Sequence, residues 1–191
     1  MKGSSLNSPM MRSIMTEEIL DYGKSKGFHP HTLERWLKLT EPAQAALFEL
    51  VRELKMGENH FRDIVDWIEE ISLREGMEVH EILSRDSISK ISSDPRLGRS
   101  DKLKRVKEEL RRLRFPRLAR LEQEIQERIR LLKLGPEIRI SVPPGLEGGV
   151  LMVQLKSASY PGLKGLVEEL GRVVEREPLK EIFDFLGGER V

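Results

Sequence analysis

Apolar residues recur at intervals of three and four along most of this chain, and glycine or proline interrupts the pattern repeatedly. This spacing is typical of amphipathic α-helices, whose apolar residues line one face. Charged residues make up 34% of the 191 residues and aromatic residues only 5%, a balance that suits several small helical units better than one large core. The sequence therefore predicts a mainly α-helical protein.

The first helical segments predict a helix-turn-helix. Residues 1–14 are mostly small, polar and aperiodic, which indicates a disordered lead. Thr16 then caps a helix that stops near Gly27, and a short turn leads into a second helix with Trp36 on its apolar face. Two short helices joined by a tight turn are typical of this motif. With the helices that follow, they predict a helical module at 15–84.

The second half of the sequence predicts a different module. Residues 85–100 are rich in serine and predict a linker. A basic helix then opens a module at 101–191, in which apolar and polar residues alternate over Ile138–Val142. Gly148-Gly149 precedes a returning strand, and another amphipathic helix follows it. We therefore expect a long basic helix and an α-β-β-α unit at the C-terminus.

Charge is segregated along the chain, although the net charge is only +1. Residues 101–120 carry nine basic and three acidic residues, a net charge of +6, and residues 59–84 carry a net charge of −5. On a helix, four of the cations form one continuous stripe: Lys104, Lys107, Arg111 and Arg114. Such a stripe predicts contact with a nucleic-acid backbone, where binding releases counterions.

The helix-turn-helix is also basic, with a net charge of +3 over residues 22–39. Side chains on the exposed side of a second helix are the ones that reach base edges and phosphates. The residues predicted to bind nucleic acid here are Lys24, Lys26, His31, Thr32, Arg35 and Lys38.

The order of these pieces resembles the ParB-type chromosome and plasmid partition proteins. The family's helix-turn-helix pattern is similar to Thr16–Leu20, Gly23–Lys26 and Leu33–Leu39, and its GHAR-like stretch is similar to Gly57–Arg62. The resemblance implies a non-enzymatic protein that binds duplex DNA. Because the chain begins almost at the helix-turn-helix, we expect it to lack the family's N-terminal nucleotide-binding domain.

The tail resembles the family's dimerisation module, a helix followed by two strands and a short leucine helix. Its parallels are Leu132–Gly135, Ile138–Ile140, Gly148–Val153 and Leu163–Leu170. A lone two-stranded hairpin is marginally stable, so pairing with a second copy would satisfy its edge. The residues expected at the dimer contact are Ile138, Ile140 and Val153, and, from the resemblance, Leu166 and Leu170.

Other classes of protein have little support in the sequence. There is no phosphate-binding glycine motif and no nucleophile elbow, and the four histidines lack the spacing of a zinc site. We therefore expect no catalytic residues, no metal and no cofactor. The chain has no cysteine, no long apolar run and no signal-peptide pattern, which favours a cytoplasmic protein without a membrane span.

Two alternatives remain open. The basic helix could dock an acidic partner or the chain's own acidic residues 59–84, which would make the protein a helical protein-interaction adaptor with no nucleic-acid role. A hydrolase or nuclease would require a metal cluster that these residues do not supply.

Overall fold

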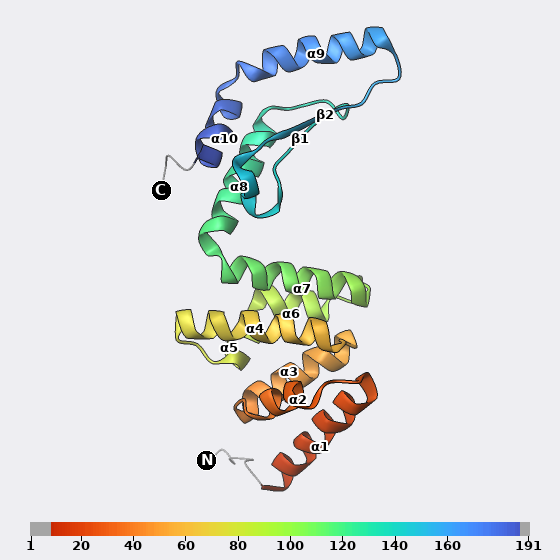
Figure 1. Cartoon of the computed structure of the whole chain (residues 1–191), viewed down its shortest axis with the longest axis vertical. Helices are drawn as coiled ribbons and strands as arrows, with labels where there is room; N and C mark the ends of the chain where they lie inside the picture. Colours follow the sequence, from red (N-terminus) through yellow and green to blue (C-terminus); the bar gives the residue numbers. More distant parts are fainter. Residues whose placement is uncertain (1–8, 188–191) are drawn as a thin grey trace. The chain divides into compact units, whose positions relative to one another are not determined.

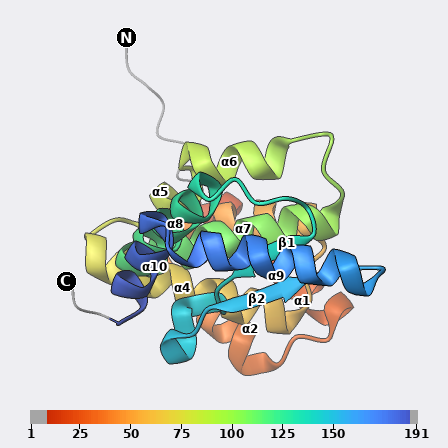
Figure 2. The ribbon, with the colours of Figure 1, turned by 90° about the horizontal axis from the view of Figure 1, so that it is seen from above.

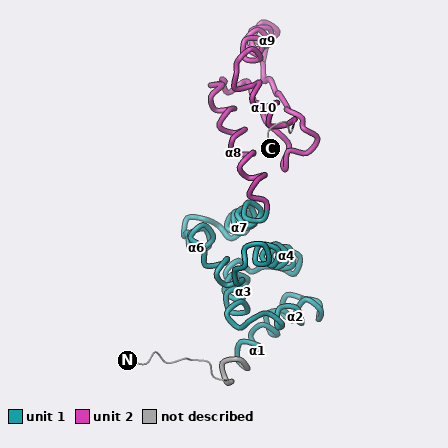
Figure 3. The backbone as a smooth tube through the Cα atoms, turned by 90° about the vertical axis from the view of Figure 1, so that its left-hand side faces the viewer, with its two compact units in different colours: residues 1–114 teal, residues 115–191 magenta. Residues whose placement is uncertain are grey.

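The computed structural model describes residues 9–187, with side chains from Ile14 onward. The chain divides into two compact units, residues 1–114 and 115–191 (Figure 3). Each unit contains its own cluster of buried apolar residues. The fold is mainly helical with one small antiparallel sheet, which confirms the predicted class.

The N-terminal unit is built from helices alone in the part that the structure describes (Figure 1). They are α1 (Pro9–Lys26), α2 (Pro30–Leu37), α3 (Glu41–Leu54), α4 (Glu58–Glu75), α5 (Val79–Leu83), α6 (Asp86–Ser93) and α7 (Arg99–Arg114). Most of these helices end at residues that favour termination. Gly76, for example, has a left-handed conformation with φ of 65°, which glycine adopts without steric cost.

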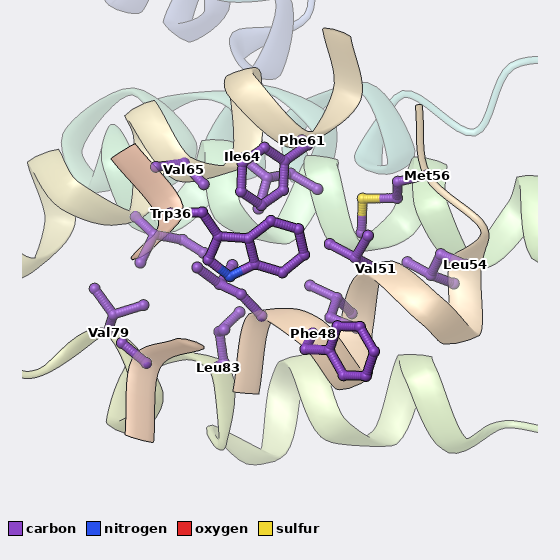
Figure 4. Packing of buried hydrophobic residues seen from close by; sticks show 14 of the residues in the cluster. Trp36, Phe48, Val51, Leu54, Met56, Phe61, Ile64, Val65, Val79 and Leu83 are labelled. Carbon is purple, nitrogen blue, oxygen red and sulfur yellow. The ribbon is translucent and has the colours of Figure 1, made fainter. Parts of the chain in front are cut away.

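An aromatic cluster holds α2 in the N-terminal unit (Figure 4). Trp36 is fully buried, and its ring centroid lies 4.5 Å from that of Phe61 on α4 and 6.3 Å from that of Phe48 on α3. Phe28, in the turn before α2, lies 5.4 Å from Phe61. Because these rings come from α2, α3, α4 and the turn, their packing fixes α2 against its neighbours.

A buried amide fixes the other end of α2. The Gln44 Nε2 atom donates hydrogen bonds to the carbonyl oxygens of Leu37 and Leu39, at 2.9 and 2.8 Å. The Leu37 carbonyl lies in the last turn of α2 and the Leu39 carbonyl just beyond it, where carbonyls lack partners within the helix. The first turns of α3 therefore hold the C-terminal end of α2.

The basic helix α7 belongs to the N-terminal unit, so the predicted module boundary at 85–100 is wrong. Val106 and Leu110 are fully buried in the N-terminal core, and α7 packs against α3, α4 and α6. The predicted linker itself contains α6, where Ile88 is buried and Ile91 is half-buried one turn later. Serine is a weak helix former, but the burial of these isoleucines stabilises the helix.

The predicted lead at 1–14 also differs from the structure. Helix α1 begins at Pro9, seven residues before the predicted cap at Thr16. Proline suits the first turn of a helix because its missing N–H would be unpaired there in any case. Residues 1–8 of the predicted lead lie outside the described residues.

The C-terminal unit has the predicted order of a helix, two strands and a helix, followed by a further short helix. Its elements are α8 (Pro116–Leu131), β1 (Ile138–Ser141), the 3-10 segment η1 (Pro144–Gly149), β2 (Met152–Leu155), α9 (Tyr160–Val174) and α10 (Glu177–Gly187). The strands are antiparallel, with Ile138 opposite Leu155 and Ile140 opposite Val153. Figure 2 shows β1, β2 and α9 from above.

Candidate functional site

The helices α1 and α2 form the expected helix-turn-helix, joined by Gly27, Phe28 and His29. Gly27 has φ of 70°, a left-handed conformation that allows the sharp turn. His29 caps α2, because its Nδ1 atom accepts a hydrogen bond from the His31 backbone N–H at 3.3 Å. Pro30 follows at the first helical position. The turn and the start of α2 are therefore specified by local sequence.

Four of the six predicted residues of this motif are exposed. Lys24 and Lys26 lie at the end of α1, His31 lies in the first turn of α2, and Lys38 follows its last turn. Among the described residues, none of the three lysines forms an ion pair. These side chains are available to an external anion.

The other two predicted residues, Thr32 and Arg35, are bonded within the unit. Thr32 is buried, and its hydroxyl donates a hydrogen bond to the Glu58 carboxylate. The Arg35 guanidinium donates to Asp66 and Glu69 of α4, each at 2.5 Å. They therefore attach α2 to α4.

A pocket of about 360 Å³ lies where α2 meets α4. It brings His31, Thr32 and Arg35 together with two residues that the sequence-based site omitted, His29 and Arg62. Arg62 is exposed and belongs to the stretch that resembles the family's GHAR motif, so that resemblance was the available signal. The lining contains two arginines, two histidines and one carboxylate, that of Glu58.

Glu58 makes this corner sensitive to acid. Hydrogen bonds from the Thr32 hydroxyl and from the His29 backbone N–H, the latter at 3.1 Å, lower the pKa of Glu58 below 4.5. Because the folded-state pKa is the lower one, Glu58 stabilises the fold above pH 4.5, and this contribution is lost as pH falls through the folded value.

We expect Glu58→Gln to make the free energy of unfolding less dependent on pH below 4.5, since the variant has no carboxylate to protonate. Urea denaturation at a series of pH values measures the effect. Glu34→Gln is the matched control, because Glu34 is an exposed carboxylate of α2 without a hydrogen bond among the described residues. Equal acid dependence in the wild type and Glu58→Gln would contradict this assignment.

The predicted cationic stripe of α7 is largely paired with carboxylates. The Lys107 Nζ atom lies 2.7 Å from Asp63 Oδ2, and Arg114 Nη2 lies 2.7 Å from Glu70 Oε1. Arg111 contacts Glu108, one turn earlier on the same helix, at 3.1 Å. Lys104 is exposed and forms no ion pair with the described residues. Acidic residues of α4 thus neutralise part of the stripe.

The predicted dimer residues divide into two groups. Ile138 and Ile140 are buried within the C-terminal unit, where Ile140 packs in the cluster formed by α8, α9 and α10. They are therefore core residues and not exposed contacts. Val153 on β2 is 42% exposed, and Leu166 and Leu170 on α9 are half-buried.

Much of the apolar face of α9 is uncovered. Helix α9 contacts α10 but extends away from α8 and the strands (Figures 1 and 3). Val167 is 54% exposed, and Leu163 and Val174 are also exposed on the same side. Large apolar side chains of this kind normally pack against another element.

The described residues contain no cluster of three or more side chains suited to a metal ion. None of the helices within residues 9–187 combines the length and apolar character that a membrane span requires. Comparison of the chain with protein-family models found no match, and comparisons with curated proteins and with solved structures found none either.

Proposed function

We propose that this chain is a DNA-binding homodimer, in which α1 and α2 contact duplex DNA and the C-terminal unit joins two copies. The observation that carries the DNA part is the set of exposed lysines on the helix-turn-helix. Lys24, Lys26 and Lys38 have no carboxylate partner among the described residues, so each can neutralise a phosphate.

The basic helix α7 has a smaller part in this proposal than its charge alone suggests. A lysine that already contacts a carboxylate gains less from a phosphate, because the carboxylate must be displaced and then left unpaired. Lys107 and Arg114 already contact carboxylates of α4 in this way. Helix α7 therefore acts mainly as a structural element that packs against α4.

The uncovered face of α9 supports the dimer. Leu163, Leu166 and Leu170 recur at intervals of three and four on this face, the spacing that lets two helices pack along a common seam. The exposed Val153 on β2 could extend the contact. Two copies would present two helix-turn-helix motifs, which raises avidity for DNA without any new type of contact.

The resemblance to ParB-type proteins supports the same assignment and adds a biological process. It covers most of residues 15–174 and includes both the helix-turn-helix and the dimerisation module. We therefore propose chromosome or plasmid partition as the process in which the DNA-binding dimer takes part, in the cytoplasm.

The DNA part is tested by the salt dependence of binding. We expect wild-type protein to bind fluorescent duplex DNA, with an affinity that falls steeply as salt rises. Lys24→Gln combined with Lys38→Gln should make the slope of log affinity against log salt smaller by about two units, because two phosphate contacts are lost. Fluorescence anisotropy at several salt concentrations gives this slope.

Lys107→Gln combined with Arg114→Gln is the matched control, since it removes the same charge from α7. We expect its slope to stay within about half a unit of wild type. If the slope falls more in this variant than in the Lys24→Gln and Lys38→Gln variant, the DNA interface lies on α7 instead. Failure of the wild type to bind duplex DNA at low salt would refute the DNA part.

A second candidate is the protein-interaction adaptor, and the ion pairs between α4 and α7 favour it. If the basic helix serves to hold the acidic face of the same unit, the dimer would present partner-binding surfaces and no DNA site. A wild-type protein that dimerises but does not retard duplex DNA at low salt would favour this candidate.

A further inference from the structure

A second cavity, of about 410 Å³, lies between α4 and α7 in the N-terminal unit. The two helices are neighbours over much of their length (Figure 1). The cavity is separate from the pocket between α2 and α4, with which it shares no residue. Its size lies within the range of ligand pockets in proteins. We call it the Trp67 groove.

Two apolar side chains line the groove, and one of them carries an unused hydrogen-bond donor. Trp67 and Leu103 line it, and both are only half-buried. Trp67 has no ring contact with the aromatic cluster around Trp36. Its indole N–H forms no hydrogen bond among the described residues and is not buried, unlike that of Trp36. The groove thus offers an apolar contact beside a free N–H.

Most of the other lining residues are cationic. They include Lys104, Lys107, Arg111 and His60, against the single carboxylate of Glu108. Lys107 is neutralised by Asp63 and Arg111 by Glu108, but Lys104 is exposed and has no ion-pair partner in the described chain. An anionic partner would therefore meet the unpaired charge of Lys104.

We propose that the Trp67 groove binds an acidic peptide segment of a partner protein. One apolar side chain of the segment packs between Trp67 and Leu103. An adjacent carboxylate accepts hydrogen bonds from the Lys104 ammonium and the Trp67 indole N–H. This surface is distinct from the lysines of the helix-turn-helix and from the face of α9, so it does not depend on the proposed function.

The geometry favours a peptide over a single-stranded nucleic acid. Binding of single strands relies on aromatic faces that are open to base stacking. The Lys107 ammonium lies 5.2 Å from the centroid of the Trp67 ring and covers one of its two faces, so bases cannot stack on both sides of it. A polyanion would also have to approach Asp63 and Glu108, whereas a single carboxylate needs only Lys104 and the indole N–H.

The test uses the full chain and short fluorescein-labelled peptides in which glutamates flank one leucine, phenylalanine or tryptophan. We expect saturable binding in fluorescence anisotropy by at least one of these peptides. Lys104→Glu should weaken that binding about tenfold, because an attractive charge becomes a repulsive one. Trp67→Phe, which keeps an aromatic side chain but removes the N–H, should weaken it about fivefold.

The matched control is Arg105→Glu, which makes the same charge reversal at the next, exposed position outside the groove. We expect it to change the affinity by less than about twofold. Circular dichroism melts establish that each variant is folded. A labelled oligothymidylate tests whether the groove binds single-stranded nucleic acid instead. Peptides with glutamine in place of glutamate test the charge requirement.

Three results would each overturn the proposal: absence of saturable binding by every acidic peptide, equal weakening by Lys104→Glu and Arg105→Glu, or tighter binding of oligothymidylate than of any peptide. Duplex binding and sedimentation test the DNA-binding dimer in separate experiments. Failure of peptide binding is therefore distinguishable from failure of the DNA-binding dimer.

Discussion

Replacing Leu166 and Leu170 with glutamate is expected to abolish the proposed dimer and leave a monomer. Both leucines lie on the apolar face of α9, beside the exposed Leu163 and Val167. Burying one leucine side chain contributes about 1.5–3 kcal/mol, so losing two weakens association at least about a hundredfold. Sedimentation equilibrium over a range of protein concentrations measures the change in the dissociation constant.

Arg172→Glu is the control for this experiment. Arg172 is exposed and lies on the opposite side of α9 from the apolar face, so its charge reversal should leave the dissociation constant within about threefold of wild type. The far-ultraviolet circular dichroism of all variants should match that of wild type. A wild-type protein that sediments as a monomer at every concentration would refute the dimer.

Trp36→Ala will strongly destabilise the N-terminal unit. The side chain is fully buried and contacts the rings of Phe28, Phe48 and Phe61. Truncating a buried tryptophan costs about 3–5 kcal/mol, a large part of the 5–15 kcal/mol that is typical of whole domains. Differential scanning calorimetry should show the melting transition of this unit at a much lower temperature.

In the same scan, the melting temperature of the C-terminal unit should not change, because its apolar cluster contains no residue of the N-terminal core. Ile182→Ala is the reciprocal variant, since Ile182 is fully buried in the C-terminal cluster. This variant should lower the melting temperature of the C-terminal unit and leave that of the N-terminal unit unchanged. A single melting transition that shifts in both variants would contradict the presence of two independent cores.

Much of the fold could be predicted because its signals are local. The three-and-four spacing of apolar residues predicted most helices, and the alternation at Ile138 and Ile140 predicted β1. Gly27 and Pro30 marked the turn of the helix-turn-helix correctly. These signals act through the backbone geometry of a few neighbouring residues, so no knowledge of the tertiary structure is needed.

The predicted unit boundary was wrong because burial is not a local property. The serines of residues 85–100 favour a loop, yet Ile88 is buried when α6 packs against α7. Helix α7 was expected to belong to the C-terminal module, but Val106 and Leu110 anchor it in the N-terminal core. Long-range packing overrode local propensity in α6 and decided to which unit α7 belongs.

For the candidate site, the sequence was sufficient to locate the cations and the apolar face of α9, since both follow from residue type and helical spacing. Which cations are free was decided by the tertiary structure. Lys107 and Arg114 contact carboxylates that lie 44 residues earlier in the chain, whereas Lys24 and Lys38 meet none within the described residues. An ion pair depends on which helices pack together, and charge patterns along one helix do not contain that information.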